Sequence, residues 1–247
     1  MTAVLFVHGF PFDHLLWRHQ VAALARWQCL APDLRGAGAS GASASAYEYS
    51  MGAYADDLIA LLDRARISEA VVCGLSLGGY IVFELLRRFP ERVRAAILCN
   101  TKAVADTPEA KRGRDALAAR ATKDGSGAVA AELVPKLLAR STRERRPEVV
   151  REATEMILRQ PVAGIVGALR ALRERPDSTP LLDRIRIPVL VVAGDDDQIA
   201  PAGAMQQMAR AIPGSEFVLV GEAGHLAPLE QPLAVNAALD GFLERLR

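Results

Sequence analysis

A serine flanked by glycines lies between an apolar run and a segment of helical composition. Residues 74–78 read Gly-Leu-Ser-Leu-Gly, and Gly79 follows them. Residues 70–73 are apolar, and residues 80–86 have the composition of a helix. A serine on a tight strand-to-helix turn adopts a strained backbone, and side chains two residues to either side would collide with neighbouring backbone. The spacing predicts that Ser76 is a nucleophile, raised above the carboxyl ends of the strands.

A serine hydroxyl is a poor nucleophile at neutral pH and needs an adjacent base. Of the four histidines, only His225 lies in a late loop, residues 221–225, directly after an apolar run. We expect that loop at the carboxyl edge of the sheet, within reach of the serine. His14 and His19 are expected to be surface or capping residues, and His8 is expected to support the loop after the first strand.

A carboxylate between the serine and the histidine in sequence would complete the set. Asp195, Asp196 and Asp197 follow the apolar run 189–193, and the chain order Ser, Asp, His fits. We predict Asp197, three residues after Gly194, because its reach past the strand end would bring its carboxylate to the imidazole. It would fix the tautomer and stabilise the imidazolium. Spacing alone leaves the other two open; they are expected to be solvated or to brace the loop.

Two backbone N–H groups are expected to stabilise the negative charge that acyl transfer places on a carbonyl oxygen. One is that of Leu77, at the start of the helix behind the serine, where the helix dipole favours negative charge. The other is that of Phe10, in the His-Gly-Phe-Pro sequence of residues 8–11. Pro11 helps to hold this turn. The alternative is that Phe10 is only a hydrophobic plug.

The elements that position these residues follow from alternating apolar and helical patterns. Buried strands are expected at residues 3–7, 29–31, 70–75, 93–99, 189–193 and 217–220. Helices are expected at residues 15–26, 51–66, 80–88, 202–211 and 233–246. Apolar runs without polar alternation indicate strands buried on both faces, and intervening helices indicate parallel crossovers. The pattern predicts an α/β fold with a mostly parallel, doubly wound sheet.

Residues 101–186 interrupt this alternation, since they are rich in Ala, Arg, Leu and Glu and contain no strong strand run. Four prolines are expected to divide them into short helices: Pro135, Pro147, Pro161 and Pro176. We expect a helical cap, or lid, at residues 101–186 over a core made of residues 1–100 and 187–247. The alternative is a set of surface helices with no gating role.

The overall composition argues against several classes of partner. The 30 basic and 29 acidic residues leave a formal net charge of +1, which gives no reason to expect nucleic acid or acidic lipid. Neither a signal peptide nor an apolar run long enough for a membrane span is evident. The cysteines, Cys29, Cys73 and Cys99, form no CxxC and are expected to be reduced and packed in strands, which favours a cytoplasmic setting.

One glycine pattern resembles a dinucleotide-binding loop but lacks its context. Residues 36–41 spell G-x-G-x-x-G, and Asp56 follows at about the right distance. However, three residues separate the motif from its strand, and the loop continues through residues 42–46 where a helix would be required. Asp56 falls inside an expected helix. Nucleotide binding is therefore not expected.

Together these residues resemble the α/β-hydrolase superfamily over essentially the whole chain. The matching segments are residues 8–11, 32–40, 74–79, 194–201 and 224–232. Residues 8–13, 98–101 and 175–179 are similar to the carboxylesterase and 3-oxoadipate enol-lactonase branch. The resemblance implies hydrolysis of small carboxylic esters or lactones without cofactor or metal, and it favours Asp197 as the acid.

The sequence departs from the family pattern at its first buried strand. Family members usually carry an antiparallel hairpin before the first buried strand, whereas Met1 already lies at that strand. The strand at Cys29 could then be an exposed edge, and a homodimer could cover it.

The leading expected function is a carboxylesterase. The alternatives are a lactonase for an enol-lactone or an acyl-homoserine lactone, a cofactor-free perhydrolase, and a weakly catalytic ligand-binding receptor. Haloalkane dehalogenation is disfavoured because it needs a carboxylate in place of Ser76. Candidate pocket residues, each also a candidate for plain core, are Phe12, Trp17 and Met156.

Overall fold

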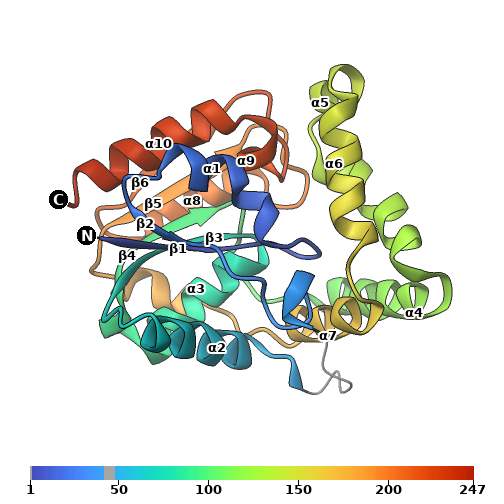
Figure 1. Cartoon of the computed structure of the whole chain (residues 1–247), viewed down its shortest axis with the longest axis horizontal. Coiled ribbons are helices and arrows are strands. Elements are labelled where there is room, and N and C mark those ends of the chain that lie inside the picture. The colour runs from blue at the N-terminus through green and yellow to red at the C-terminus, as the bar shows by residue number, and fades with distance from the viewer. Residues whose placement is uncertain (1, 42–47) are drawn as a thin grey trace.

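Continuous apolar segments form one six-stranded sheet in the computed structural model, which describes residues 2–41 and 48–247 (Figure 1). The strands are β1 (Ala3–Val7), β2 (Gln28–Leu30), β3 (Ala70–Leu75), β4 (Val93–Cys99), β5 (Val189–Gly194) and β6 (Glu216–Val220). Their order is β2-β1-β3-β4-β5-β6, and every neighbouring pair is parallel. Every residue of β1, β3 and β5 is buried, as apolar runs covered on both faces require. The predicted α/β fold with a parallel sheet is confirmed.

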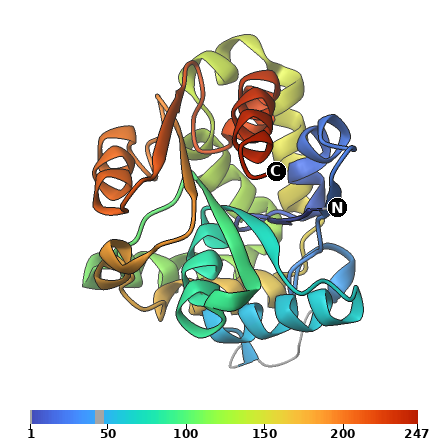
Figure 2. The same ribbon diagram turned by 90° about the vertical axis from the view of Figure 1, so that its left-hand side faces the viewer.

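Helices cover both faces of this sheet. They are α1 (Arg18–Ala23), α2 (Met51–Arg64), α3 (Leu77–Arg88), α8 (Ala202–Ala211), α9 (Ala227–Glu230) and α10 (Pro232–Glu244). Helix α1 packs beside α10 on one face, and α2 packs beside α3 on the opposite face (Figures 1 and 2). No helix in the described ranges combines the length and apolarity needed to cross a bilayer.

Two helices differ most from the sequence expectation. The segment expected as one helix over residues 15–26 is a 3₁₀ turn, η1 (His14–Trp17), followed by the short α1. The Asp13 side chain accepts a hydrogen bond from the Leu15 N–H and starts this turn. Helix α3 begins at Leu77, three residues before the expected start, because it follows the serine directly.

The stretch between β4 and β5 contains four α-helices, which lie beyond the carboxyl end of β1, and a final 3₁₀ segment that contacts α8 (Figure 1). They are α4 (Pro108–Leu137), α5 (Arg140–Arg145), α6 (Pro147–Leu158), α7 (Val162–Arg173) and η5 (Thr179–Arg184).

Prolines divide this stretch as expected at three of the four positions. Pro147 begins α6, Pro161 precedes α7, and Pro176 follows α7. The expectation for Pro135 was wrong, since it lies inside the last turns of α4. The break within α4 is instead at Gly125, whose φ of +79° a glycine adopts without steric cost.

The chain reverses its direction of sheet growth at β1. It passes from β1 outward to the three-residue edge strand β2 and then returns to β3 on the other side of β1. In open parallel sheets, ligands bind beyond the carboxyl ends of the strands at such a switch point. The topology therefore places a binding crevice between the ends of β1 and β3.

Candidate active site

The serine turn has the geometry that its glycines predicted. Ser76 lies between β3 and α3 with φ 53° and ψ −108°, a conformation that is costly for a residue with a side chain. A Cβ on Gly74 would come within 2.4 Å of the Gly78 carbonyl carbon. A Cβ on Gly78 would come within 2.1 Å of the Val7 carbonyl oxygen. Both positions therefore require glycine, and Ser76 itself is half-buried.

The end of β4 anchors this turn. The Ser76 N–H donates to the Cys99 carbonyl at 3.0 Å, and the Thr101 hydroxyl donates to the Ser76 carbonyl at 2.8 Å. A Cβ on Gly79 would come within 2.5 Å of Thr101, which explains the glycine after the motif. Sequence reasoning had not given Thr101 this role, because it depends on the pairing of β3 with β4.

The predicted acid and base meet as expected. His225 Nδ1 lies 2.8 Å from Asp197 Oδ2, and both residues are buried. The other carboxylate oxygen accepts from the N–H groups of Ile199 at 2.8 Å and Ala200 at 2.9 Å. Asn100 donates its amide to Asp197 Oδ2 at 2.9 Å. Four hydrogen bonds thus hold the Asp197 carboxylate in place.

These contacts favour the ionised form of Asp197. Burial by itself raises the pKa of Asp197, but the charge and hydrogen bond of His225, with those from Ala200 and Asn100, hold the pKa below its usual value. An ionised carboxylate accepts from the Nδ1–H of the ring, so Nε2 is the basic nitrogen. Motif spacing did not predict this contact between Asn100 and Asp197.

Hydrogen bonds at the ends of neighbouring strands connect Ser76 to the Asp–His pair. Asn100 follows Cys99, to which the Ser76 N–H is bonded, and Asn100 in turn bonds Asp197. Among the described residues no hydrogen bond links the Ser76 hydroxyl to the His225 ring. Such catalytic bonds are often long before substrate binds.

The histidine loop is braced against the segment that follows α4. The His225 N–H donates to the Leu137 carbonyl at 2.8 Å. The buried Glu230 accepts from the N–H of Gly224 at 2.8 Å and of Ala139 at 2.7 Å, one on each carboxylate oxygen. Burial raises the pKa of Glu230.

The two remaining aspartates of the triplet also brace loops. Asp195 accepts from the Ala223 N–H at 3.1 Å, and Asp196 accepts from the Arg140 N–H at 2.7 Å. Neither bonds to His225, so only Asp197 is placed to orient the ring.

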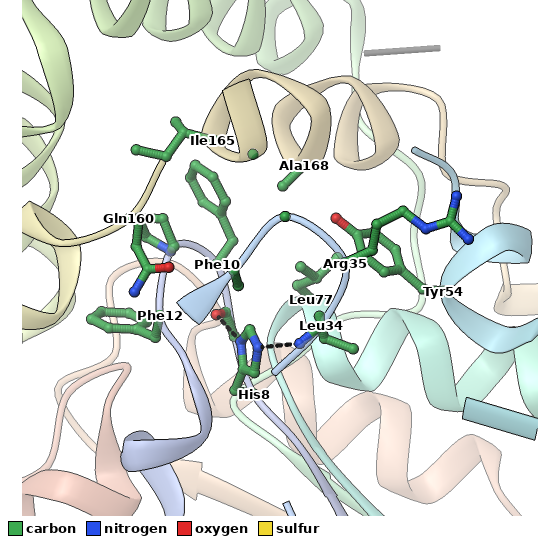
Figure 3. A pocket seen from close by; sticks show the side chains of 15 residues that line it. His8, Phe10, Phe12, Leu34, Arg35, Tyr54, Leu77, Gln160, Ile165 and Ala168 are labelled. Carbon is green, nitrogen blue, oxygen red and sulfur yellow. Dashed lines mark hydrogen bonds between the residues drawn. The ribbon is translucent and has the colours of Figure 1, made fainter. Parts of the chain in front are cut away.

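The backbone N–H groups of the two predicted donors have no partner among the described residues. Within residues 2–41 and 48–247, the N–H groups of Phe10 and Leu77 donate to no carbonyl or side chain. Both residues line a pocket of about 290 Å³, including its open mouth, at the switch point between β1 and β3 (Figure 3). A buried N–H without a protein partner is rare and suits an incoming oxygen. The Phe10 ring also points into the pocket, so the plug and donor interpretations are compatible.

His8 supports the floor of this pocket. Its Nδ1 lies 3.0 Å from the Gly9 carbonyl, and its Nε2 accepts from the Leu34 N–H at 3.0 Å (Figure 3). Burial lowers the pKa of His8, so the ring is neutral. His14 is exposed and bonds Asp33 at 2.7 Å, and His19 is half-buried away from these contacts.

Helix α7 and the residues before it form the opposite wall. Ile165 and Ala168 project toward the Phe10 ring (Figure 3). A Cβ on Gly164 would come within 1.8 Å of the Gly36 carbonyl oxygen, so α7 packs directly on the loop after β2. Gln160, also in the wall, accepts from the Gly38 N–H at 2.9 Å.

An ion pair fixes this wall to the loop after β1. Arg159 donates to both oxygens of Asp13, at 2.7 and 3.0 Å, and Gln160 donates to Asp13 at 3.0 Å. This link joins residues 146 positions apart and left no signal in the sequence.

Three residues were candidates for the pocket on sequence grounds. Phe12 lines the pocket, whereas Trp17 and Met156 are fully buried core residues outside its lining. All three cysteines are free thiols, and the buried Cys73 and Cys99 sulfurs lie 4.0 Å apart.

The remaining binding motifs are accounted for by internal contacts. The described part of the glycine-rich loop contains the 3₁₀ turn η2 (Gly38–Ser40), and residues 42–47 lie outside the described residues. Asp56 lies in α2 and pairs with Arg88 at 2.7 Å. Asp13, His14 and Asp33 could gather around a cation, but Arg159 already occupies Asp13.

Sheet order, serine turn and Asp–His pair together define an α/β-hydrolase. The family model described as "alpha/beta hydrolase fold" matches residues 2–232, and the chain belongs to this family.

Three similar proteins within the family are an esterase and two enol-lactonases. A 3-oxoadipate enol-lactonase 2 from Acinetobacter baylyi is 30% identical over 98% of this chain and 89% of that protein. A malate-bound thermophilic esterase from Thermogutta terrifontis is 40% identical with a TM-score of 0.96, covering 100% of this chain and 90% of that one. The enol-lactonase from Burkholderia xenovorans LB400 is 28% identical with a TM-score of 0.90, covering 98% and 91%.

Proposed function

We propose that the protein is a serine carboxylesterase that cleaves small carboxylic esters through an acyl-enzyme on Ser76. The observation that carries this proposal is the juxtaposition at the switch point. A strained serine turn adjoins two unpaired N–H groups, and strand ends link it to a buried Asp–His pair.

The proposed steps use protein groups and water alone. Nε2 of His225 takes the Ser76 proton while the serine oxygen attacks the ester carbonyl. The N–H groups of Phe10 and Leu77 donate to the resulting oxyanion, an effect typically worth about 3–4 kcal/mol per donor. The imidazolium, stabilised by Asp197, then gives its proton to the leaving alkoxide. Water activated by the same ring releases the acid.

The pocket favours a short acyl group. Its walls are mostly apolar, with Phe10, Leu77 and Ile165 among them, and α7 closes it by direct backbone packing on Gly36. We propose that residues 101–186 act as the cap that sets this limit. An apolar chain gains about 0.8 kcal/mol for each methylene that fits and nothing beyond the wall.

A lactonase is the second candidate, favoured by the enol-lactonases among the relatives. The same nucleophile opens a cyclic ester, and pocket shape decides between the two.

A substrate profile tests both functions. We expect p-nitrophenyl acetate and butyrate to be hydrolysed faster than the octanoate, measured beside an enol-lactone and acyl-homoserine lactones. Ser76→Ala should lower kcat by about 10⁴-fold or more. A folded Ser76→Ala variant that retains wild-type turnover would refute the proposal.

A further inference from the structure

Asn100 is a buried polar residue held in a strained backbone conformation. It directly follows β4, is fully buried, and has a φ of 44°. Its own N–H donates to the Val192 carbonyl of β5 at 2.9 Å, which fixes the backbone at this point. A positive φ is costly for a residue with a side chain, and such strain clusters at functional sites, where the surrounding structure enforces it.

The Asn100 side chain ties the loop of the acid to the loop of the base. Its amide nitrogen donates to Asp197 Oδ2 at 2.9 Å and to the carbonyl of Gly224, the residue before His225, at 3.1 Å. Both partners are acceptors, so the NH₂ group and not the carbonyl oxygen must face them. One side chain thereby holds together the two segments that carry the Asp–His pair.

This orientation leaves the Asn100 carbonyl oxygen buried without a hydrogen-bond partner among the described residues. An unsatisfied buried acceptor lowers the stability of the folded state. Asn100 thus carries two destabilising features, the positive φ and the unpaired oxygen. Both accompany the placement of its NH₂ group between the two loops, which points to a role in function beyond stability.

Asp197 Oδ2 is shared between two donors. His225 Nδ1 lies 2.8 Å from this oxygen, and the Asn100 amide bonds the same oxygen. A buried carboxylate favours a protonated imidazole beside it, and an imidazolium cannot take a proton from a serine. A neutral donor on the shared oxygen stabilises the carboxylate and weakens its preference for the imidazolium. The amide therefore favours the neutral ring without removing the bond that orients it.

We propose that Asn100 is a positioning residue, whose neutral amide aligns Asp197 with the histidine loop and keeps the His225 ring available as a base. This inference rests on the proposed function, because it concerns the base of the same site. Aspartate has the shape of asparagine but adds a carboxylate, so Asn100→Asp separates the effect of charge from that of packing.

The other ionisable groups around the Asp–His pair are the same in the wild type and in variants at residue 100. Those on the neighbouring elements are Asp195, Asp196, Glu230, Lys102 and Tyr80. The three carboxylates accept from backbone N–H groups, and Lys102 and Tyr80 interact with Asp197 only by charge. A changed pH profile in such a variant therefore reports on the side chain at residue 100.

The pH dependence of kcat/KM for p-nitrophenyl butyrate tests this role. Asn100→Gly removes the amide and tolerates a positive φ, so kcat should fall about 10–100-fold while KM stays within about twofold. The acid limb of the profile, where the base gains its proton, should move upward by about 1–2 pH units in Asn100→Asp, because the second carboxylate favours the imidazolium.

The only other asparagine of the chain provides the matched control. Asn236→Asp makes the same substitution in α10 and should leave the acid limb in place. The isosteric Asn100→Asp decides the test alone should Asn100→Gly not fold. An acid limb that coincides with that of the wild type in Asn100→Asp would overturn the proposal, even if the variant is less stable.

A titration that needs no turnover separates this inference from the proposed function. If the wild type hydrolyses no ester, the esterase proposal fails, but magnetic resonance of isotopically labelled histidine still reports the protonation of the His225 ring, assigned with His225→Asn. A higher titration midpoint in Asn100→Asp than in the wild type supports the role of Asn100. Equal midpoints overturn it.

Discussion

At the scale of single residues, the Asp197 carboxylate organises the site. It accepts four hydrogen bonds, from His225, Asn100, Ile199 and Ala200, and so fixes the ring with Nε2 as its basic nitrogen. Residue types and spacing predicted Ser76 and His225, and the family resemblance favoured Asp197 among the three neighbouring aspartates. The partners Asn100 and Thr101 were not predictable in these roles, because side-chain contacts across strand ends depend on sheet register.

We expect Asp197→Asn to lower kcat by about 10⁴-fold, the scale of the corresponding change in a serine protease, while KM changes little. An asparagine amide would present a donor to Nδ1, and the ring would be held in the wrong tautomer. Steady-state kinetics with p-nitrophenyl butyrate measures the effect, and Asp195→Asn, which makes no contact with the ring, is the matched control. Equal losses in the two variants would contradict the assignment.

The buried His8 predicts a pH dependence of stability. The unfolded ring takes up a proton near its usual pKa of 6.5, whereas the folded ring stays neutral to lower pH. The stability that its neutral form contributes is therefore present above pH 6.5 and is lost as the pH falls toward the folded pKa. We expect urea unfolding of His8→Asn to depend less on pH than the wild type between about pH 6.5 and 5, by at most ~1.4 kcal/mol per pH unit. Identical slopes would contradict this account.

At the scale of elements, the histidine loop and the start of α5 are joined by one buried side chain. Glu230 uses both oxygens on the N–H groups of Gly224 and Ala139. The strands were predictable because each is a continuous apolar run. The break in α4 was not, since a proline and a glycine compete as helix breakers and the sequence ranks Pro135 above Gly125.

We expect Glu230→Gln to lower the free energy of unfolding by about 1–3 kcal/mol, because the amide can accept only one of the two N–H groups and leaves the other buried without a partner. Chemical denaturation measures the loss. Glu155→Gln, an exposed residue of α6, is the control and should change little. A denaturation midpoint equal to that of the wild type would contradict this bracing role of Glu230.

The packing of α7 on the loop after β2 gives a prediction for substrate range. A methyl group on Gly164 would overlap the Gly36 carbonyl, so Gly164→Ala must push α7 outward. We expect a loss of stability of about 1–3 kcal/mol and a shift of kcat/KM toward longer acyl chains. Gly113→Ala in α4, where a Cβ would have no neighbour within 4 Å, is the matched control. No change in chain-length preference would show that α7 does not limit the pocket.

At the scale of the whole molecule, the sheet could be predicted and the stretch between β4 and β5 only in outline. The parallel arrangement was predictable because buried apolar strands alternate with helices, whereas the strand order came only from the structure. The packing of α4 to α7 depends on contacts such as Asp13 with Arg159, which join distant segments without a local pattern. A homodimer across the short edge strand β2 stays a proposal, and light scattering across a concentration series would test it.

Covalent labelling tests the central claim most directly. A fluorophosphonate reacts with a serine only when a base and an oxyanion site activate it. We predict a single adduct by intact-mass spectrometry, mapped to the peptide containing Ser76, absent in Ser76→Ala and strongly slowed in His225→Ala. An adduct on another residue, or equal labelling of Ser76→Ala, would contradict the account.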